Sequence, residues 1–160
     1  MNKTVSIYLD LIRFLSAILV FAYHAKYSRF DGSWLQGIGA FGHDAVMIFF
    51  VLSGFVIAYI TNAKESTLAR YSISRLARLY SVVVPALILT VALDYAGKSI
   101  NPNMYMGGHY QASEPVYRLL TNLFFINELW FSSWRAFSNG PFWSLSYEFW
   151  YYVIFASWFF

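Results

Sequence analysis

Three ionisable side chains interrupt an otherwise apolar stretch near the N-terminus: Asp10, Arg13 and His24. The eleven steps from Arg13 to His24 close to within about 20° of whole turns of an α-helix, so both side chains leave one stripe, about 16 Å apart along the axis. Asp10 lies one turn before Arg13, on nearly the same face. An imidazole exchanges protons near neutral pH and a guanidinium binds anions. The stripe therefore fits proton transfer beside an anion. A buried Asp10–Arg13 pair that only fixes helix packing, with His24 merely at the interface, would give the same pattern.

A second group of candidates lies in the next apolar stretch. Asp44 is near its start, where it either partners an imidazole or caps a helix N-terminus. Ser53 and Gly54 lie inside the stretch, where small residues also serve simple helix packing. Both interpretations stay open for each position.

Arg75 and Arg78 belong to a basic segment and are spaced i, i+3, so a helix would place them side by side. Guanidinium groups bind phosphate in bidentate fashion, which makes the pair a candidate phosphate clamp. A positive anchor on the cytoplasmic side of a membrane is the alternative.

Near the end of the chain, Ser144 and Glu148 are spaced i, i+4 and share a helix face. A carboxylate in apolar surroundings must be neutralised, hydrogen-bonded or protonated. We expect His24 and Arg13 to be its partners.

The elements that position these residues follow from composition. Of 160 residues, 59% are hydrophobic and 12% are charged, about half the charged share of soluble domains. We predict an all-α, polytopic transmembrane helix bundle. Its stripe on residues 7–25 must face protein or a wet cavity, because an ionisable group at the bilayer centre costs at least about 2.5–3.5 kcal/mol. The expected spanning helices, about five, cover residues 7–25, 43–61, 80–95, 116–131 and 142–160.

The remaining segments are expected to be loops. They cover residues 26–42, the basic linker 62–79 and the glycine-containing stretch 96–115, and Pro85 is expected to kink the third helix. Lys and Arg residues number six on the side of the N-terminus and four opposite, which favours a cytoplasmic N-terminus. The net charge of +3 requires no nucleic-acid partner. The absence of cysteine excludes disulfides and thiolate catalysis.

The histidines have no metal-ligand spacing, so we predict no metal. The final residues, 154–160, form an apolar run without flanking charge. We therefore expect residues 1–160 to be the N-terminal part of one domain, cut inside its last helix.

Together, these motifs resemble the acyltransferase-3 family of integral membrane O-acyltransferases. Its hallmark is Arg or Lys followed, after ten intervening residues, by His, here Arg13 and His24. A G-x-D and F-F-x-L-S-G-F signature is similar to Gly42–Asp44 and residues 49–55. An R-x-x-R-x-Y segment matches Arg75, Arg78 and Tyr80, and W-S-L-S-x-E matches residues 143–148, including Ser146.

The sequence departs from the family pattern at two positions. Ser81 stands where the family often has proline, and Phe149 stands where many members have a second acidic residue. The family also has about ten spanning helices, about twice the number expected here.

The resemblance implies transfer of an acyl group, commonly acetyl, from cytoplasmic acyl-CoA to a hydroxyl of a cell-surface or lipid-linked glycan. It implies a multi-pass protein of the inner cell membrane, with acyl-CoA as co-substrate and no other cofactor. His24 would be the general base, with Glu148 or Asp44 orienting it.

The implied substrate-binding set contains residues of all four motifs. Arg13 would meet the CoA phosphate or the thioester, and Arg75 and Arg78 the adenosine phosphates. Asp10, Ser53, Ser144 and Ser146 complete the set.

Two other classes fit the same residues. In a proton-coupled transporter, Asp10, Arg13, His24 and Glu148 would form a proton relay or a substrate pathway. In a structural or regulatory membrane subunit they would only hold helices together.

Overall fold

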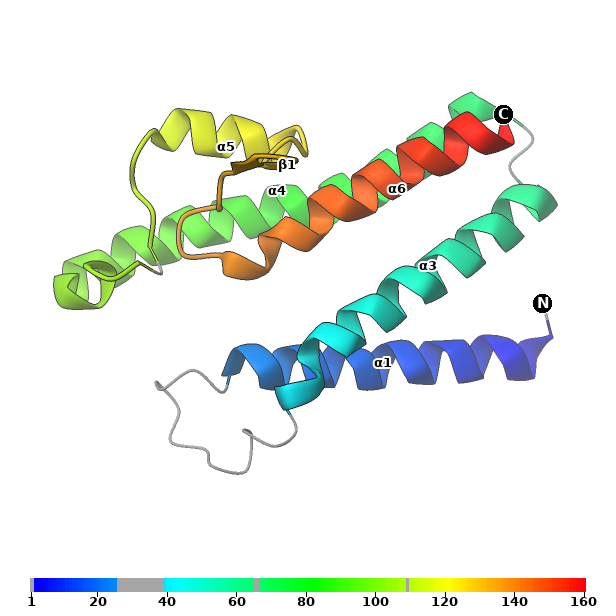
Figure 1. Ribbon diagram of the computed structural model, residues 1–160, viewed down its shortest axis with the longest axis horizontal. Coiled ribbons are helices and arrows are strands. Elements are labelled where there is room, and N and C mark those ends of the chain that lie inside the picture. Colours follow the sequence, from blue (N-terminus) through cyan, green and yellow to red (C-terminus); the bar gives the residue numbers. More distant parts are fainter. Residues whose placement is uncertain (1, 26–38, 65–66, 109) are drawn as a thin grey trace. The chain divides into compact units, whose positions relative to one another are not determined.

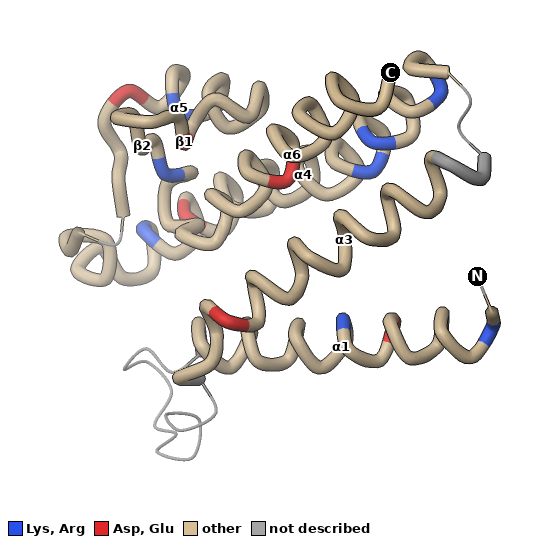
Figure 2. The backbone as a smooth tube through the Cα atoms, turned by 45° about the vertical axis from the view of Figure 1, so that its right-hand side comes forward, with Lys and Arg blue, Asp and Glu red and all other residues tan. Residues whose placement is uncertain are grey.

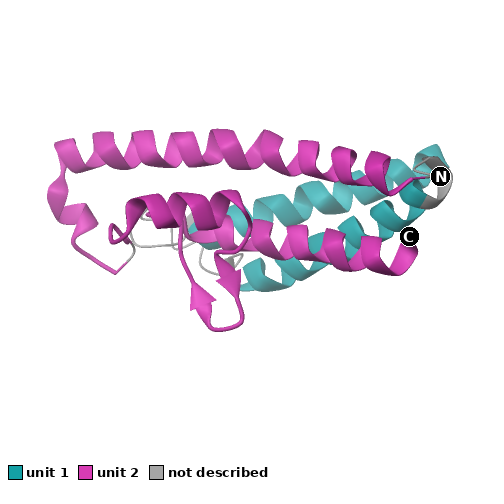
Figure 3. Cartoon of the chain, turned by 90° about the horizontal axis from the view of Figure 1, so that it is seen from above, with its two compact units in different colours: residues 1–64 teal, residues 65–160 magenta. Residues whose placement is uncertain are grey.

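The computed structural model describes residues 2–25, 39–64, 67–108 and 110–160. The chain divides into two compact units, Met1–Lys64 and Glu65–Phe160 (Figure 3). Each unit has its own helix packing and its own set of candidate residues.

The first unit is a pair of long helices. Helix α1 (Lys3–Ala25) packs against α3 (Gly42–Lys64), which follows a short 3-10 turn, η1 (Gly39–Phe41) (Figure 1). Small residues are prominent among the buried positions, which lets helix backbones approach closely; they are Ser16, Ala22, Gly42, Ala45 and Ser53. A Cβ at Gly42 would overlap the Tyr23 side chain, so glycine is required at this crossing. The helices expected over 7–25 and 43–61 are confirmed. Residues 26–38 of the expected loop lie outside the described residues.

The second unit is built on one long helix, α4 (Leu68–Ile100), of 33 residues. The Thr67 hydroxyl oxygen accepts a hydrogen bond from the Arg70 backbone N–H at 3.4 Å and caps its start. The helix continues through Pro85. The predicted loop over 62–79 is therefore wrong at residues 62–64, which belong to α3, and from residue 68 onward. The loop predicted over 96–115 is likewise wrong at residues 96–100, which belong to α4. Thr67 was an overlooked start signal, and the Arg75–Arg78 pair does lie on a helix.

The expected span over residues 116–131 is wrong. Helix α5 (Pro115–Leu123) has nine residues, about 14 Å, too short for a hydrocarbon core of about 30 Å. Phe125, at φ 59°, takes the chain out of the helix. A hairpin follows, with β1 (Glu128–Leu129) antiparallel to β2 (Ser132–Ser133). The polar residues within the apolar run marked this break, because Asn122 and Asn127 hold the loop rather than face lipid.

Helix α6 (Trp143–Phe159) follows a 3-10 turn, η3 (Gly140–Phe142), and runs antiparallel to α4 (Figure 1). Tyr71, near the start of α4, bonds the carbonyl of Tyr152 late in α6, while Arg78 meets Glu148 one turn earlier in α6. At the other end, α4 leads into η2 (Pro102–Tyr105). Helix α6 therefore returns to the end where α4 begins.

The all-α class is confirmed. Within the described ranges, three helices are long and apolar enough to cross a membrane: Lys3–His24, Gly42–Thr61 and Leu68–Ile100. Helix α6, with 17 residues, is at the lower limit of the usual spanning length. Because α5 does not cross, Arg135 joins Lys98 and Arg118 on the side where α4 ends. Lys and Arg then number five on each side, so the charge bias no longer favours either orientation.

Candidate functional site

The polar stripe of α1 is present in the first unit, and its charges are only loosely paired. Arg13 Nη1 lies 3.7 Å from Asp10 Oδ1, with the Asp10 side chain largely exposed. Arg13 Nη2 is buried and has no hydrogen-bond partner among the described residues. A buried donor without a partner costs about 1–3 kcal/mol, so Asp10 leaves part of the binding capacity of this guanidinium unused.

His24 is half-buried at the end of the same helix. Its ring meets Tyr23 edge-on, with centroids 5.1 Å apart, and Tyr23 also meets His43 at 5.4 Å. Gly42 makes room for the Tyr23 ring. Two imidazoles therefore flank one tyrosine at the α1–α3 crossing. Sequence reasoning did not single out Tyr23 or His43, although His43 lies inside a quoted motif.

The other two candidates of this unit are in α3. Asp44 is exposed in the first turn of the helix and makes no ion pair or hydrogen bond with His24 within the described residues. Ser53 is buried. Gly54 is exposed, with open space where a Cβ would be, so Ser53, rather than Gly54, is the buried member of this pair.

In the second unit, Glu148 is held between two partners. Arg78 Nη2 lies 3.2 Å from Glu148 Oε1, and the Tyr152 hydroxyl donates a hydrogen bond to the same oxygen. The carboxylate is thus neutralised by a residue of the predicted phosphate clamp. Pairing of Glu148 with His24 or Arg13 stays a prediction.

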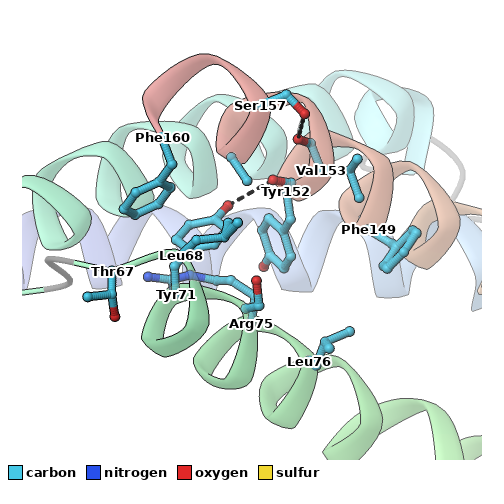
Figure 4. Close-up of a pocket in the computed structure, with 12 residues that line it drawn as sticks. Thr67, Leu68, Tyr71, Arg75, Leu76, Phe149, Tyr152, Val153, Ser157 and Phe160 are labelled. Atoms are coloured by element: carbon cyan, nitrogen blue, oxygen red, sulfur yellow. Dashed lines mark hydrogen bonds between the residues drawn. The ribbon is translucent and has the colours of Figure 1, made fainter.

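Next to this pair, a groove of about 690 Å³ lies between the start of α4 and the end of α6 (Figure 4). Most of its lining is apolar or aromatic, and Arg75 is its charged residue. The Arg75 side chain is buried, with Cζ 5.3 Å from the centre of the Tyr71 ring. The Tyr71 hydroxyl donates to the Tyr152 carbonyl at 3.0 Å and ties the two helices together. The groove suits an elongated ligand with an anionic end.

The two serines of the last motif have structural partners. Ser144 donates to the Pro141 carbonyl at 3.1 Å, and fully buried Ser146 donates to the side-chain oxygen of Asn127. Both hold the segment before α6 in place, and their role in substrate binding stays a prediction. Phe149, the departure from the family pattern, stacks on Phe125 with ring centres 4.7 Å apart.

Arg118 makes four side-chain hydrogen bonds, and sequence reasoning counted it only for topology. It is buried, and its guanidinium lies over the Trp134 ring at 4.9 Å. Its hydrogen bonds reach the side chains of Gln111 and Ser113 and the carbonyls of Ser113 and Arg135. The sequence feature that could have marked Arg118 as a buried residue is its position one turn before Asn122 in an apolar run.

Asp94 was also missed, although it is a carboxylate in the apolar part of α4. It is buried and accepts a hydrogen bond from the Ser138 backbone N–H at 3.2 Å. One turn earlier, Thr90 accepts from the Asn139 side chain at 3.0 Å. The two residues clamp the turn that leads into α6.

In the described part of the chain, no group of three or more His, Cys, Asp or Glu side chains is placed to hold a metal ion. The prediction that the protein uses no metal stays a prediction.

These features define a helical membrane protein with a loosely paired Arg–His stripe and an arginine-lined groove. The sequence model described as "Acyltransferase domain" matches residues 6–160, and the chain therefore belongs to this family, the acyltransferase-3 family. It is 28% identical over 159 residues to "Acyltransferase MdmB" of Streptomyces mycarofaciens, an alignment that covers 92% of this chain and 38% of that protein. None of the solved structures matches the chain.

Proposed function

We propose that the whole protein is a membrane-bound O-acyltransferase. It moves an acyl group from cytoplasmic acyl-CoA to a hydroxyl of a cell-surface or lipid-linked glycan, and we propose acetyl as that group. Membership of the family over residues 6–160 supports acyl transfer. The observation that carries the choice of donor is the groove between α4 and α6, with buried Arg75 as its charged residue.

The groove is proposed as the donor site because its two kinds of lining match the two parts of acyl-CoA. Arg75 supplies a fork of N–H donors for a phosphate, and Arg78 lies one helical turn further on. Aromatic and aliphatic side chains, among them Tyr71, Phe149 and Tyr152, face the space that the pantetheine arm would fill. The volume of about 690 Å³ is within the usual range for small-molecule sites.

The reaction itself is assigned to the stripe of α1. His24 takes the proton of the acceptor hydroxyl as its oxygen attacks the thioester carbonyl. The new C–O bond forms as the C–S bond breaks, and the imidazolium returns the proton to the leaving thiolate, giving free CoA thiol and neutral His24. Arg13, one nitrogen of which has no hydrogen-bond partner in the part of the chain that the structure describes, binds donor phosphate or the carbonyl oxygen. Glu148 or Asp44 orients His24.

In the proposed orientation, the protein lies in the inner cell membrane and its N-terminus is in the cytoplasm. The start of α4, the end of α6 and the groove between them then lie on the side where acyl-CoA is made.

Radiolabelled acetyl-CoA tests the proposal on membranes that contain the whole protein. We expect saturable binding, strongly weakened by Arg75→Ala and retained by His24→Ala, whereas transfer to glycan is lost in both. Arg70→Ala is the matched control, because Arg70 is exposed on the same helix. Absence of saturable binding at normal protein levels, or proton-coupled substrate flux without acyl-CoA, would rule the proposal out in favour of a transporter.

A further inference from the structure

Helix α5 has its polar and apolar faces the opposite way round from a helix on a water-soluble protein. Its polar residues Arg118, Thr121 and Asn122 are buried, whereas Val116, Leu120 and Phe124, spaced i, i+4 and i+8, are exposed. A helix at a water surface buries its apolar stripe and exposes charge. This arrangement is expected where lipid, rather than water, is the surrounding solvent.

The hairpin after α5 continues the same apolar surface. Trp130 and Phe131 form its two-residue turn and are almost completely exposed. Trp130 has φ 40°, at the first central position of the turn, where glycine is usual in hairpins with this geometry. A bulky ring at positive φ is unfavourable, so the exposed aromatic pair is not explained by the needs of the turn.

Contacts with helix α4 indicate how deep this segment lies in the membrane. Between Arg78 and Asp94 it carries no charged residue (Figure 2), and this stretch lies inside a candidate membrane span. The segment that contains α5 and the hairpin is bonded to α4 near both ends of this stretch. Tyr80 donates to the Leu123 carbonyl at 3.2 Å near one end, and Asp94 accepts from Ser138 at the other.

The non-helical backbone of the segment accepts hydrogen bonds on the side that faces the rest of the protein. Asn122 Nδ2 donates to the Arg118 and Trp134 carbonyls, each at 2.8 Å, and Trp150 Nε1 donates to the Phe125 carbonyl at 3.0 Å. Non-helical backbone is tolerated at membrane depth where it packs against protein in this way.

From this inverted polarity and depth we infer that residues 115–142 form a re-entrant segment. It enters the membrane from the side where α4 ends and leaves on the same side before α6 begins. Its outer surface, made of Val116, Leu120, Phe124, Trp130 and Phe131, contacts lipid acyl chains. The occupant is lipid because these five side chains carry no charge and continue the apolar surface of a spanning helix. The carboxylate of the hairpin, Glu128, is half-buried and accepts a hydrogen bond from the Ser133 hydroxyl at 2.6 Å. The inference does not depend on the acyl-transfer chemistry.

The chain has no cysteine, so single-cysteine variants test the inference directly. Leu120→Cys, Phe124→Cys and Phe131→Cys probe the outer surface, and Asn103→Cys in exposed η2 is the aqueous control. Because the three probed side chains are exposed, replacing them removes little packing. Each cysteine is reacted with a membrane-impermeant maleimide in intact membranes. In a second set it is labelled with the fluorophore NBD, and the protein is placed in vesicles of phosphatidylcholine with or without brominated acyl chains.

We expect the three outer positions to react at least about ten-fold more slowly than Asn103→Cys with the maleimide. We also expect brominated lipid to lower their NBD fluorescence at least about two-fold, since bromine quenches on contact within the acyl region. Reaction as fast as the control would show a water-exposed segment. Slow reaction without quenching would show that another part of the protein, or a second copy, covers the surface. Either outcome would overturn the inference.

Discussion

The two units differ in how completely their buried polar groups are hydrogen-bonded. In the α1–α3 unit, Arg13 keeps a buried nitrogen without a partner in the described residues, and His24 has ring contacts but no hydrogen bond there. In the α4–α6 unit, Glu148 has two partners and Arg118 has four hydrogen bonds, although Asn122 Oδ1 has no hydrogen-bond partner among the residues described. Unsatisfied polar groups indicate where a ligand or a reaction supplies the missing partner. Satisfied groups hold the fold together.

The comparison predicts that changes on the α1 stripe alter the reaction rate, whereas changes to the hydrogen-bonded groups around Arg118 and Glu148 in the second unit first alter stability. Four sets of substitutions can break or sharpen this contrast.

The largest effect is expected at His24. His24→Ala should lower the acyl-transfer rate by about 100-fold or more, the usual scale for loss of a general base, and His24→Gln should fail almost as badly because an amide cannot accept the proton. His43→Gln is the matched control, since its ring contacts the same tyrosine. Rates are measured per amount of protein in membranes. Near-normal turnover by His24→Gln would end the catalytic assignment.

The next effect is expected at Arg118, and on stability. Arg118→Ala leaves several acceptors without a donor and should lower the free energy of unfolding by about 1–3 kcal/mol for each acceptor that stays buried. Arg118→Lys should recover only part, because one ammonium cannot replace the planar fork. Thermal unfolding in detergent measures the loss. Arg135→Gln is the control, because only the backbone carbonyl of that residue bonds Arg118. An Arg118→Ala protein as stable as the parent would contradict the network.

A glycine pair in α3 tests the helix crossing of the first unit. Gly42→Ala places a methyl group into Tyr23 and should cost about 1–3 kcal/mol, as overpacking usually does. Gly54→Ala meets nothing within 4 Å and should be neutral or stabilising by up to about 1 kcal/mol. Unfolding of the two variants side by side checks the difference. Equal stability would mean that the crossing is looser than described.

The smallest effect is expected from the Arg78–Glu148 pair. Because the Arg78 side chain is about half exposed, a double-mutant cycle on stability should give a coupling of only about 0.2–1 kcal/mol. The rate of Glu148→Gln adds a second readout. An unchanged rate would limit Glu148 to holding α4 and α6 together, whereas a large loss at normal stability would support its role beside His24.

The sequence predicted the first unit well because its signals are local. A long apolar run flanked by polar segments fixes a membrane helix almost by length alone, and both helices end within four residues of the expected positions. The stripe from Arg13 to His24 needed only helical geometry. What it could not show is how weakly Asp10 pairs with Arg13, because that depends on packing against α3.

The second unit was predicted less well because its signals are tertiary. Basic residues before Tyr80 suggested a loop, yet they lie on α4, where Arg75 faces the groove and Arg78 meets Glu148. Residues 116–131 have the composition of a span. Their polar members instead bond to one another and to α6, and the chain turns at Phe125. No periodicity in one segment reveals a partner that lies twenty or more residues away.

Arg13 provides the most direct test of the claim that the loosely paired stripe binds and processes the acyl donor. Arg13→Lys keeps the charge but loses the bidentate fork. In membranes matched for protein amount, it should raise the KM for acyl-CoA by about ten-fold, equivalent to about 1.4 kcal/mol of binding, while retaining part of kcat. Asp10→Asn, which breaks the ion pair and spares the guanidinium, should leave that KM nearly unchanged. If both variants instead lower the protein yield equally, with an unchanged KM for acyl-CoA, the pair is structural and the account is contradicted.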